Sequence, residues 1–295
     1  MEHYSPLRYP GGKAKLAPFI AAVMRRNGHV YPEYVEPYAG GAGVALHLLF
    51  EEYADRVIIN DADPRIHCFW VAATQYTEEF VELVRVTPVS VDEWYRQREI
   101  YTICDMESPL LLGFATFFLN RTGRSGITHS GGPIGGYDQT GTYKIDARFN
   151  RDDLCRRLVR IGAFADRIEA VNKDGLRLLE RLAEDRSRID ETVVYLDPPY
   201  HDKSDELYLN HFTDEQHGAL ARFLRKEAEF AWILTYDDAP AIRELYRESP
   251  QMVVNLKYSA YKSRKGWELL IHPPSMAITK TEQAVLPRVG RGSAK

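Results

Sequence analysis

The sequence has few cysteines and no long apolar run, and each absence excludes a class of protein. Cys68, Cys104 and Cys155 are its only cysteines, and no two of them form a C-x-x-C pair. They support neither a disulfide framework nor a zinc site, and they indicate a cytoplasmic protein. The apolar run at 109–119 is much shorter than the roughly 20 residues that span a bilayer, so it predicts a buried helix and no membrane partner. The first residues also lack the apolar core of a signal peptide.

The chain also lacks an excess of one charge. Its 38 lysines and arginines stand against 42 aspartates and glutamates, a net charge of −4. This excludes a protein that is basic all over, although a local basic groove on an acidic body is compatible with it. With 44% hydrophobic residues in 295, the chain is too apolar for a disordered protein. The length predicts one large domain with an insertion, or two domains.

Strands and helices alternate along most of the chain. Strands are expected at 34–36, 56–60, 167–171, 192–196, 230–235, 252–256 and 269–271. Helices are expected between them, at 14–27, 43–53, 154–164, 176–184, 214–226 and 239–246. Strands linked by helices predict an α/β fold with a doubly wound, Rossmann-like sheet.

One region interrupts this alternation. Residues 71–150 show helical segments and no buried strand, and residues 123–141 hold seven of the 20 glycines. A glycine-rich loop of this length is usually functional or disordered. We therefore expect a discontinuous catalytic domain, an inserted, mainly helical module and a flexible tail. The catalytic domain is expected at residues 1–70 and 151–280, the inserted module at 71–150 and the tail at 281–295.

A first candidate site follows the strand at 34–36. In residues 36–43 (EPYAGGAG) the chain leaves the strand and enters a helix, and small residues let a ligand approach its backbone. A tight turn without any ligand explains this segment alone equally well. Asp61 ends the next strand, where an acid can accept hydrogen bonds from ribose hydroxyls, whereas Asp63 is expected to cap a helix. The combination predicts an adenosine-containing ligand, and the lack of a phosphate-binding lysine motif favours one without phosphate.

A second candidate site is Asp197-Pro198-Pro199-Tyr200, directly after the apolar strand at 192–196. The prolines lack N–H donors, so the segment offers acceptors, namely the Asp197 carboxylate and the Pro198 carbonyl. With the Tyr200 ring as a stacking surface, these acceptors suit a planar molecule that carries an exocyclic amine. A proline-rich turn with a capping aspartate would explain D-P-P, but it explains the whole arrangement poorly.

The ordered set of motifs resembles the Dam-type (D12 class) adenine-N6 DNA methyltransferases from about Leu7 to Ile278. Residues 7–13 (LRYPGGK) are similar to the family's aromatic-x-G-G-K element, and 36–43 to its E-P-F-x-G-x-G, with an extra small residue. Residues 118–121 (FLNR) resemble the F-x-N-R that opens the family's recognition hairpin. D-P-P-Y then follows the inserted region, as it does in the family.

The resemblance implies a cofactor, S-adenosylmethionine, with S-adenosylhomocysteine as its product. The residues implied to bind it are Tyr9, Gly11, Gly12, Lys13, Glu36, Pro37, Tyr38, Gly40, Gly41, Gly43, Asp61, Asp174 and Asp197. The catalytic segment is implied to be Asp197, Pro198, Pro199 and Tyr200. No metal is implied by the sequence or required by this chemistry.

Double-stranded DNA is the implied substrate, and basic residues in or near the insertion are its candidate contacts. A solvated surface explains any one basic cluster as well, but clusters mixed with aromatics favour contact with phosphate. The predicted DNA-binding residues are Arg8, Asn120, Arg121, Arg124, Ser125, Lys144, Lys262, Arg264 and Lys265. For both Arg8 and Lys13, contact with the cofactor carboxylate and contact with DNA are open alternatives. Family members that read GATC commonly continue N-R-x-G with aromatic-Asn-Gly, which this chain lacks, so no target sequence is predicted.

The predicted reaction is methylation of N6 of an adenine that is flipped out of the duplex. One alternative is another amino-group methyltransferase, acting on RNA or protein glutamine, although such enzymes more often carry N-P-P-Y. A second alternative is a DNA-binding regulator without catalysis, which would have no reason to keep both motifs intact. A cognate restriction nuclease that acts separately is a compatible partner.

Overall fold

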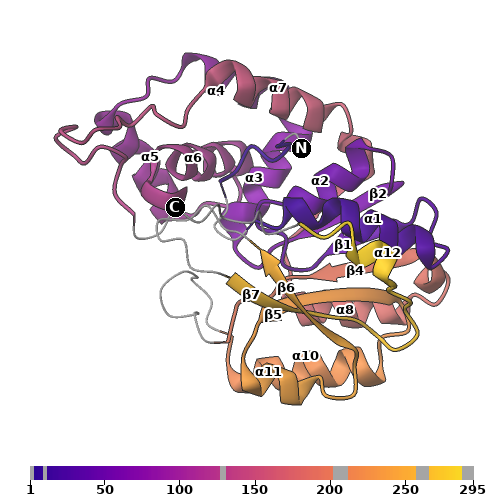
Figure 1. Ribbon diagram of the computed structural model, residues 1–295. Helices are drawn as coiled ribbons and strands as arrows, with labels where there is room; N and C mark the ends of the chain where they lie inside the picture. The colour runs from indigo at the N-terminus through magenta and orange to yellow at the C-terminus, as the bar shows by residue number, and fades with distance from the viewer. Residues whose placement is uncertain (1–2, 9–11, 127–130, 202–211, 257–265, 288–295) are drawn as a thin grey trace.

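The computed structural model describes residues 3–8, 12–126, 131–201, 212–256 and 266–287. Within these residues seven strands form one sheet, in the order β3-β2-β1-β4-β5-β7-β6 (Figure 1). The strands are β1 Glu33–Glu36, β2 Arg56–Asn60, β3 Ile168–Val171, β4 Thr192–Leu196, β5 Ala231–Asp237, β6 Gln251–Leu256 and β7 Gly266–Ile271. The predicted α/β sheet is confirmed, and each expected strand lies within a few residues of its prediction.

The first five strands are parallel, and β7 is antiparallel to both β5 and β6. From β1 the chain winds outward through β2 to β3, and then returns to place β4 on the other side of β1. The strand order therefore reverses between β1 and β4. In open α/β sheets the carboxyl ends of the strands at such a point form the crevice in which ligands bind.

Helices cover both faces of the sheet, as Figure 1 shows. One face carries α8 Gly175–Glu184, α10 Asp214–Lys226 and α11 Pro240–Leu245, and a core cluster that includes Val35 and Val194 fills the space beneath them. The opposite face carries a larger set. It comprises α1 Ala17–Arg26, α2 Gly43–Phe50, α3 Pro64–Gln75, α4 Thr77–Val86, α5 Val91–Ile103, α6 Pro109–Thr122 and α7 Arg151–Gly162, with α12 Lys280–Gln283 beside α1.

Local signals explain several helix limits. Asp63 caps α3 by accepting the Arg65 N–H at 2.9 Å, as predicted, and Pro64 occupies the first helical position, where no N–H is needed. Asn150 caps α7 in the same way. Helix α2 ends at Phe50, earlier than the predicted Tyr53, because Glu52 has a φ of +56°, which a helix does not tolerate.

The helices between β2 and β3 form a continuous packed layer. Helix α6 lies against α3 and α5, and α7 lies against α4 and α3. Gly113 of α6 makes the closest approach, since a Cβ there would lie 2.5 Å from the Cys68 carbonyl oxygen and 2.8 Å from the Ala72 Cβ. After α6 the chain turns through the short helix η2, Arg124–Gly126, and pairs back on itself at Gly123 and Pro133.

Candidate active site

The strand reversal brings both sequence motifs to one edge of the sheet. Strands β1 and β4 are parallel neighbours, with Val35 opposite Val194 in register. The glycine turn 37–43 continues from the carboxyl end of β1, and the segment 197–200 continues from that of β4. The two motifs are far apart in the chain, and they lie at the same edge of the sheet because of the sheet order alone.

The glycine turn has a left-handed backbone at two positions. Gly40 has a φ of +47° and Ala42 a φ of +45°, directly before α2 begins. Trp70 of α3 fixes the turn by donating its indole N–H to the Gly40 carbonyl at 3.0 Å. At Gly43 a Cβ would approach the Ala14 Cβ to 3.0 Å, so a small residue is needed where α2 meets the N-terminal segment. Gly40 and Gly41 are buried within this packing.

Asp61 faces the turn from the end of β2. Its carboxylate accepts the Gly40 N–H at 3.0 Å and the Asp63 N–H at 2.9 Å. Burial raises the pKa of Asp61 to about 6, and the Asp63 charge adds to this effect. A carboxylate has about four acceptor positions, so two remain for a ligand with hydroxyl groups. These remaining acceptor positions are compatible with the predicted ribose contact.

Asn60, which the sequence analysis did not single out, ties three strand ends together. Its side-chain amide donates to the Pro37 carbonyl at 2.7 Å and to the Lys173 carbonyl at 3.0 Å, and its oxygen accepts the Lys173 N–H at 2.9 Å. The side chain is fully buried. A polar residue at the end of an apolar strand (RVIIN) was the signal that could have identified it.

Tyr38 and Asp174 lie on the β3 side of the turn. The Tyr38 ring fills the space over Gly175, where a Cβ would lie 2.4 Å from the ring. Asp174 caps α8 by accepting the Arg177 N–H at 3.1 Å. Burial raises the pKa of Tyr38, and its hydroxyl has no hydrogen-bond partner within the described residues. A buried hydroxyl without a hydrogen-bond partner in the described part of the chain is compatible with a polar ligand at this edge of the sheet.

Glu36 is buried at the end of β1 and points toward α2. Its carboxylate accepts the Ala45 N–H at 2.8 Å and so satisfies a donor in the first turn of α2. Burial raises the pKa of Glu36 to about 8, and the charge of Asp197 adds to this effect. In this structure Glu36 therefore supports the helix that follows the turn, and its contact with a cofactor stays a prediction.

The segment 197–200 is held by Lys13. The Lys13 ammonium lies 2.8 Å from one Asp197 carboxylate oxygen and 3.0 Å from the other, and it donates to the Tyr200 hydroxyl at 2.6 Å. Its nitrogen is also 5.1 Å from the centre of the Tyr200 ring. Lys13 is buried, whereas Asp197 and Tyr200 are partly exposed. Lys13, from the N-terminal motif, thus faces the segment 197–200.

Three further residues complete this cluster, and none of them was predicted from the sequence. Thr235 of β5 donates to the Asp197 carboxylate at 2.9 Å, and its hydroxyl is 2.8 Å from that of Tyr195. Glu268 of β7 lies 3.3 Å from the Lys13 ammonium and accepts a hydrogen bond from Tyr200. For Glu268 the available signal was a single acid within an otherwise apolar strand (GWELLI).

Several of the predicted DNA-binding residues make a second cluster. Asn120, at the end of α6, is buried, and its amide donates to the Arg8 carbonyl at 2.8 Å and the Gly126 carbonyl at 2.9 Å. The Arg8 guanidinium donates to the Gly123 carbonyl at 3.0 Å. Asn120 and Arg8 therefore fix the start of the glycine-rich segment to the N-terminal segment.

Arg121 lies in a group of arginines. Its side chain is largely buried, and its Nε has no hydrogen-bond partner within the described residues. Burial lowers the pKa of Arg121 to about 9, and the positive charges of Arg157, Arg8 and Arg148 lower it further. The negative charge of Asp153 opposes this effect, and Asp153 is already paired with Arg157 at 2.7 Å. This gathering of like charges favours an anion.

The remaining predicted residues differ in position. Arg124 is exposed, with its guanidinium near Gly136, and Lys144 is exposed and donates to the Gln139 carbonyl at 2.6 Å. Gly12 is exposed beside Lys13, and Ser125 lies in η2. Pro198 is buried and Pro199 partly exposed. The predicted residues outside the described part of the chain are Tyr9, Gly11, Lys262, Arg264 and Lys265.

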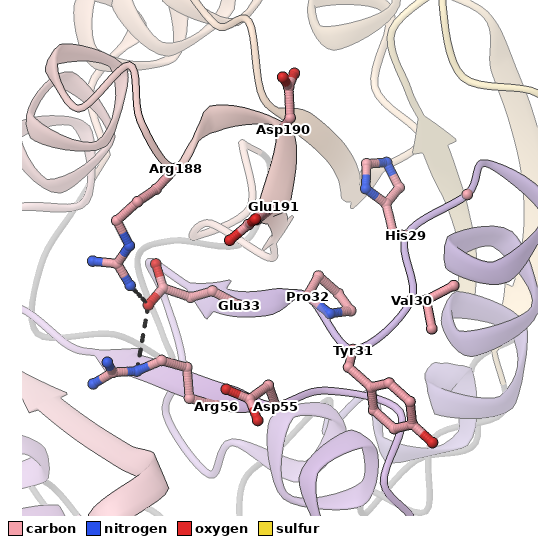
Figure 2. A pocket seen from close by; sticks show the side chains of 11 residues that line it. His29, Val30, Tyr31, Pro32, Glu33, Asp55, Arg56, Arg188, Asp190 and Glu191 are labelled. Carbon is pink, nitrogen blue, oxygen red and sulfur yellow. Dashed lines mark hydrogen bonds and ion pairs between the residues drawn. The ribbon is translucent and has the colours of Figure 1, made fainter.

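A recess at the opposite, amino edge of the sheet has a different character (Figure 2). Glu33 lies between Arg56, at 3.4 Å, and Arg188, and forms an ion pair with each. These charges pair with one another, and ligands of open sheets bind at the carboxyl edge, so this recess is not the candidate active site. In the described ranges no group of histidine, cysteine and acidic side chains could hold a metal, and no helix is long and apolar enough to cross a membrane.

The chain matches the model of one known family. Residues 9–260 match the model of the family described as D12 class N6 adenine-specific DNA methyltransferase. The match covers most of the chain, including the glycine turn and the segment 197–200. No curated protein is similar enough to the chain to count as a match.

Proposed function

This chain belongs to the D12 class N6 adenine-specific DNA methyltransferase family, and from that premise we propose that it transfers the methyl group of S-adenosylmethionine to N6 of a flipped-out adenine. The family makes it an enzyme that methylates adenine in DNA. One observation carries the rest of the proposal: Asp197 and Tyr200 lie at the strand reversal beside the glycine turn, and their side chains are held by Lys13.

The cofactor would bind at the carboxyl ends of β1 and β2. Asp61 would accept hydrogen bonds from the ribose hydroxyls, since its carboxylate keeps acceptor positions and is already oriented by Gly40 and Asp63. The turn 37–43 would contact the ligand through its backbone, because its small side chains let a ligand approach the backbone closely. Asp174 and Tyr38 border the same crevice on the β3 side. When bound, the sulfonium supplies an activated methyl group, so the protein contributes chiefly position and electrostatics.

Asp197 and the Pro198 carbonyl would accept the two N–H groups of the target amine. The lone pair of adenine N6 is delocalised into the ring, and accepting both hydrogens directs that lone pair toward the methyl group. Once N6 has accepted the methyl group, the carboxylate of Asp197 would receive the extra proton that N6 then carries. Stacking on Tyr200 would fix the plane of the base, and stacking of this kind needs the adenine outside the duplex.

The helical module and the glycine-rich segment after α6 are proposed to bind the DNA. The arginine group at Arg121, Arg8 and Arg148 suits backbone phosphate, because burial and mutual repulsion make an anion favourable there. Arg124 is exposed on the hairpin and is free to reach a base edge. Lys144 is a further exposed cation in the same segment. A restriction nuclease that cuts the same sequence is a compatible cytoplasmic partner.

Methyl transfer from radiolabelled S-adenosylmethionine to duplex DNA, RNA and protein tests the proposal directly. We expect label in DNA alone, recovered as N6-methyladenine after hydrolysis. Asp197→Ala should lose turnover by several orders of magnitude and retain cofactor binding by calorimetry, because Asp197 acts on the amine. Label in RNA or protein, or near-normal turnover of Asp197→Ala, would contradict the proposal.

A further inference from the structure

We propose that Glu268 is a positioning residue of the methyl-transfer site, which receives the Lys13 ammonium when the target amine takes its place on Asp197. This inference rests on the proposed function. It concerns a residue of β7, more than 60 residues beyond the D-P-P-Y segment (268 − 200 = 68), and the contacts of four side chains carry it.

Lys13 and the target amine compete for the Asp197 carboxylate. The Lys13 ammonium donates to both of its carboxylate oxygens, at 2.8 and 3.0 Å, and Thr235 donates to one of them at 2.9 Å. An adenine amine that donates to the same carboxylate competes with an ionic hydrogen bond, which is stronger than a neutral one. Three of the about four acceptor positions of this carboxylate are thus taken, and an amine that uses the remaining one weakens the hold of Asp197 on Lys13.

A second carboxylate lies within reach of the Lys13 ammonium. Glu268 lies 3.3 Å from the same ammonium and is almost fully buried, with only 1% of its surface exposed. A small movement of Lys13 brings it from Asp197 onto Glu268, so the ammonium keeps an anionic partner throughout. A buried cation that moves away from one carboxylate is stabilised when a second carboxylate receives it.

Glu268 also fixes the Tyr200 ring. Its hydroxyl accepts from Lys13 and donates to Glu268, so the carboxylate fixes the end of the ring opposite to the backbone. A stacking surface held at both ends is preorganised for a base. Glu268 therefore acts on the substrate through two neighbours, Lys13 and Tyr200.

The charges around Glu268 set when this role is available. Burial raises the pKa of Glu268, and the negative charge of Asp197 adds to this, while Lys13 and the Tyr200 hydroxyl lower it. Among the described residues, further titratable groups on this part of the sheet are Tyr195 of β4 and Tyr236 and Asp237 of β5, and Asp237 lies opposite Glu268. Only the ionised carboxylate can receive Lys13 as an anion, so turnover should increase with pH as Glu268 loses its proton.

The test compares the wild type with Glu268→Gln and Glu268→Asp in single-turnover methylation between pH 5.5 and 9. Loss of a hydrogen bond to a charged group predicts a decrease of about 10- to 100-fold in the transfer rate for Glu268→Gln. We expect a much smaller change in the affinity for S-adenosylmethionine. The increase of the transfer rate with pH that we assign to Glu268 should be absent in Glu268→Gln. It should be present in Glu268→Asp, at a different pH.

A matched control is Glu282→Gln, another buried carboxyl, which belongs to a capping box on α12 away from the site. It should keep the wild-type rate and pH profile. Wild-type rate and profile in Glu268→Gln would overturn the inference. A uniform loss in both Glu268 variants with an unchanged profile would reduce Glu268 to a structural role and overturn it as well. If the wild type itself transfers no methyl group to adenine, the proposed function fails instead.

Discussion

Asn120 and Arg8, 112 residues apart in the chain, bind each other through two reciprocal hydrogen bonds. The Arg8 N–H donates to the Asn120 side-chain oxygen at 2.7 Å, and the Asn120 amide donates to the Arg8 carbonyl at 2.8 Å. The same amide holds the Gly126 carbonyl. One buried side chain thereby joins the N-terminal segment, which leads to Lys13, with the glycine-rich segment proposed to bind DNA.

Asn120→Ala should separate these two segments. Because up to three backbone groups lose their partner, we expect the free energy of unfolding to decrease by about 1–3 kcal/mol. Methylation should weaken in addition, since both Lys13 and the hairpin lose support. Chemical denaturation and methylation kinetics measure the two effects, with exposed Gln283→Ala as a control. An unchanged free energy of unfolding would mean that the Asn120 contacts contribute little.

Asp61→Asn tests the predicted ribose contact. The charged hydrogen bonds that it removes are worth on the order of 1.5–3 kcal/mol, so affinity for S-adenosylmethionine should decrease about 10- to 100-fold. Asp63→Asn is the matched control, because Asp63 is the next acid along the chain and caps α3, a role that asparagine also fills. Equal affinities of the two variants in calorimetry would refute the assignment of Asp61.

The sequence predicted the motifs better than the contacts that complete the site. The apolar runs RVIIN and TVVYL correspond to β2 and β4 with unchanged limits, because a fully buried strand needs continuous apolar residues. Their terminal acids, Asp61 and Asp197, follow from the rule that ligands bind at strand carboxyl ends.

Glu268, Thr235 and Asn60 were not predicted because their roles arise only in three dimensions. Glu268 contacts Lys13 through the antiparallel strand β7, and no local pattern indicates that β7 lies beside β5. Thr235 is one hydroxyl in an apolar strand, which a sequence presents as an ordinary core position. The partners of Asn60 lie on two other strand ends, and their identity depends on the sheet order.

Glu36 predicts a pH dependence of stability. Its folded pKa of about 8 lies above the value of 4.5 expected for an exposed glutamate, so its contribution to stability is complete below pH 4.5 and is lost as pH rises toward 8. Glu36→Gln removes this loss and keeps an acceptor for the Ala45 N–H. The advantage of the variant should therefore grow with pH, by on the order of 1.4 kcal/mol per unit between about pH 5 and 8. Denaturant unfolding at several pH values measures it, and exposed Glu248→Gln should show a constant difference.

Gly113→Ala should destabilise the helical layer. The added methyl group would meet the Cys68 carbonyl oxygen at 2.5 Å, so α6 and α3 must move apart. Overpacking of this kind typically costs about 1–3 kcal/mol. Gly218→Ala on α10 is a matched control, because the nearest atom there is the end of a flexible arginine side chain at 3.3 Å. Equal melting temperatures of the two variants would contradict the close packing of α3 and α6.

Arg124→Ala distinguishes two kinds of DNA contact. If the exposed guanidinium reads a base, its loss should cost about 1–3 kcal/mol and relax the preference at one position beside the adenine. If it contacts phosphate alone, methylation should weaken equally on every sequence, with a shallower dependence on salt. We expect base reading for Arg124, because its side chain is exposed on the hairpin, and phosphate contact for Arg121, which lies buried among other arginines. Methylation of a duplex library with randomised flanks, by the wild type, Arg124→Ala and Arg121→Ala, measures both outcomes. Uniform weakening by Arg124→Ala would assign it to phosphate, and unchanged preference and activity in both variants would place target recognition elsewhere in the chain.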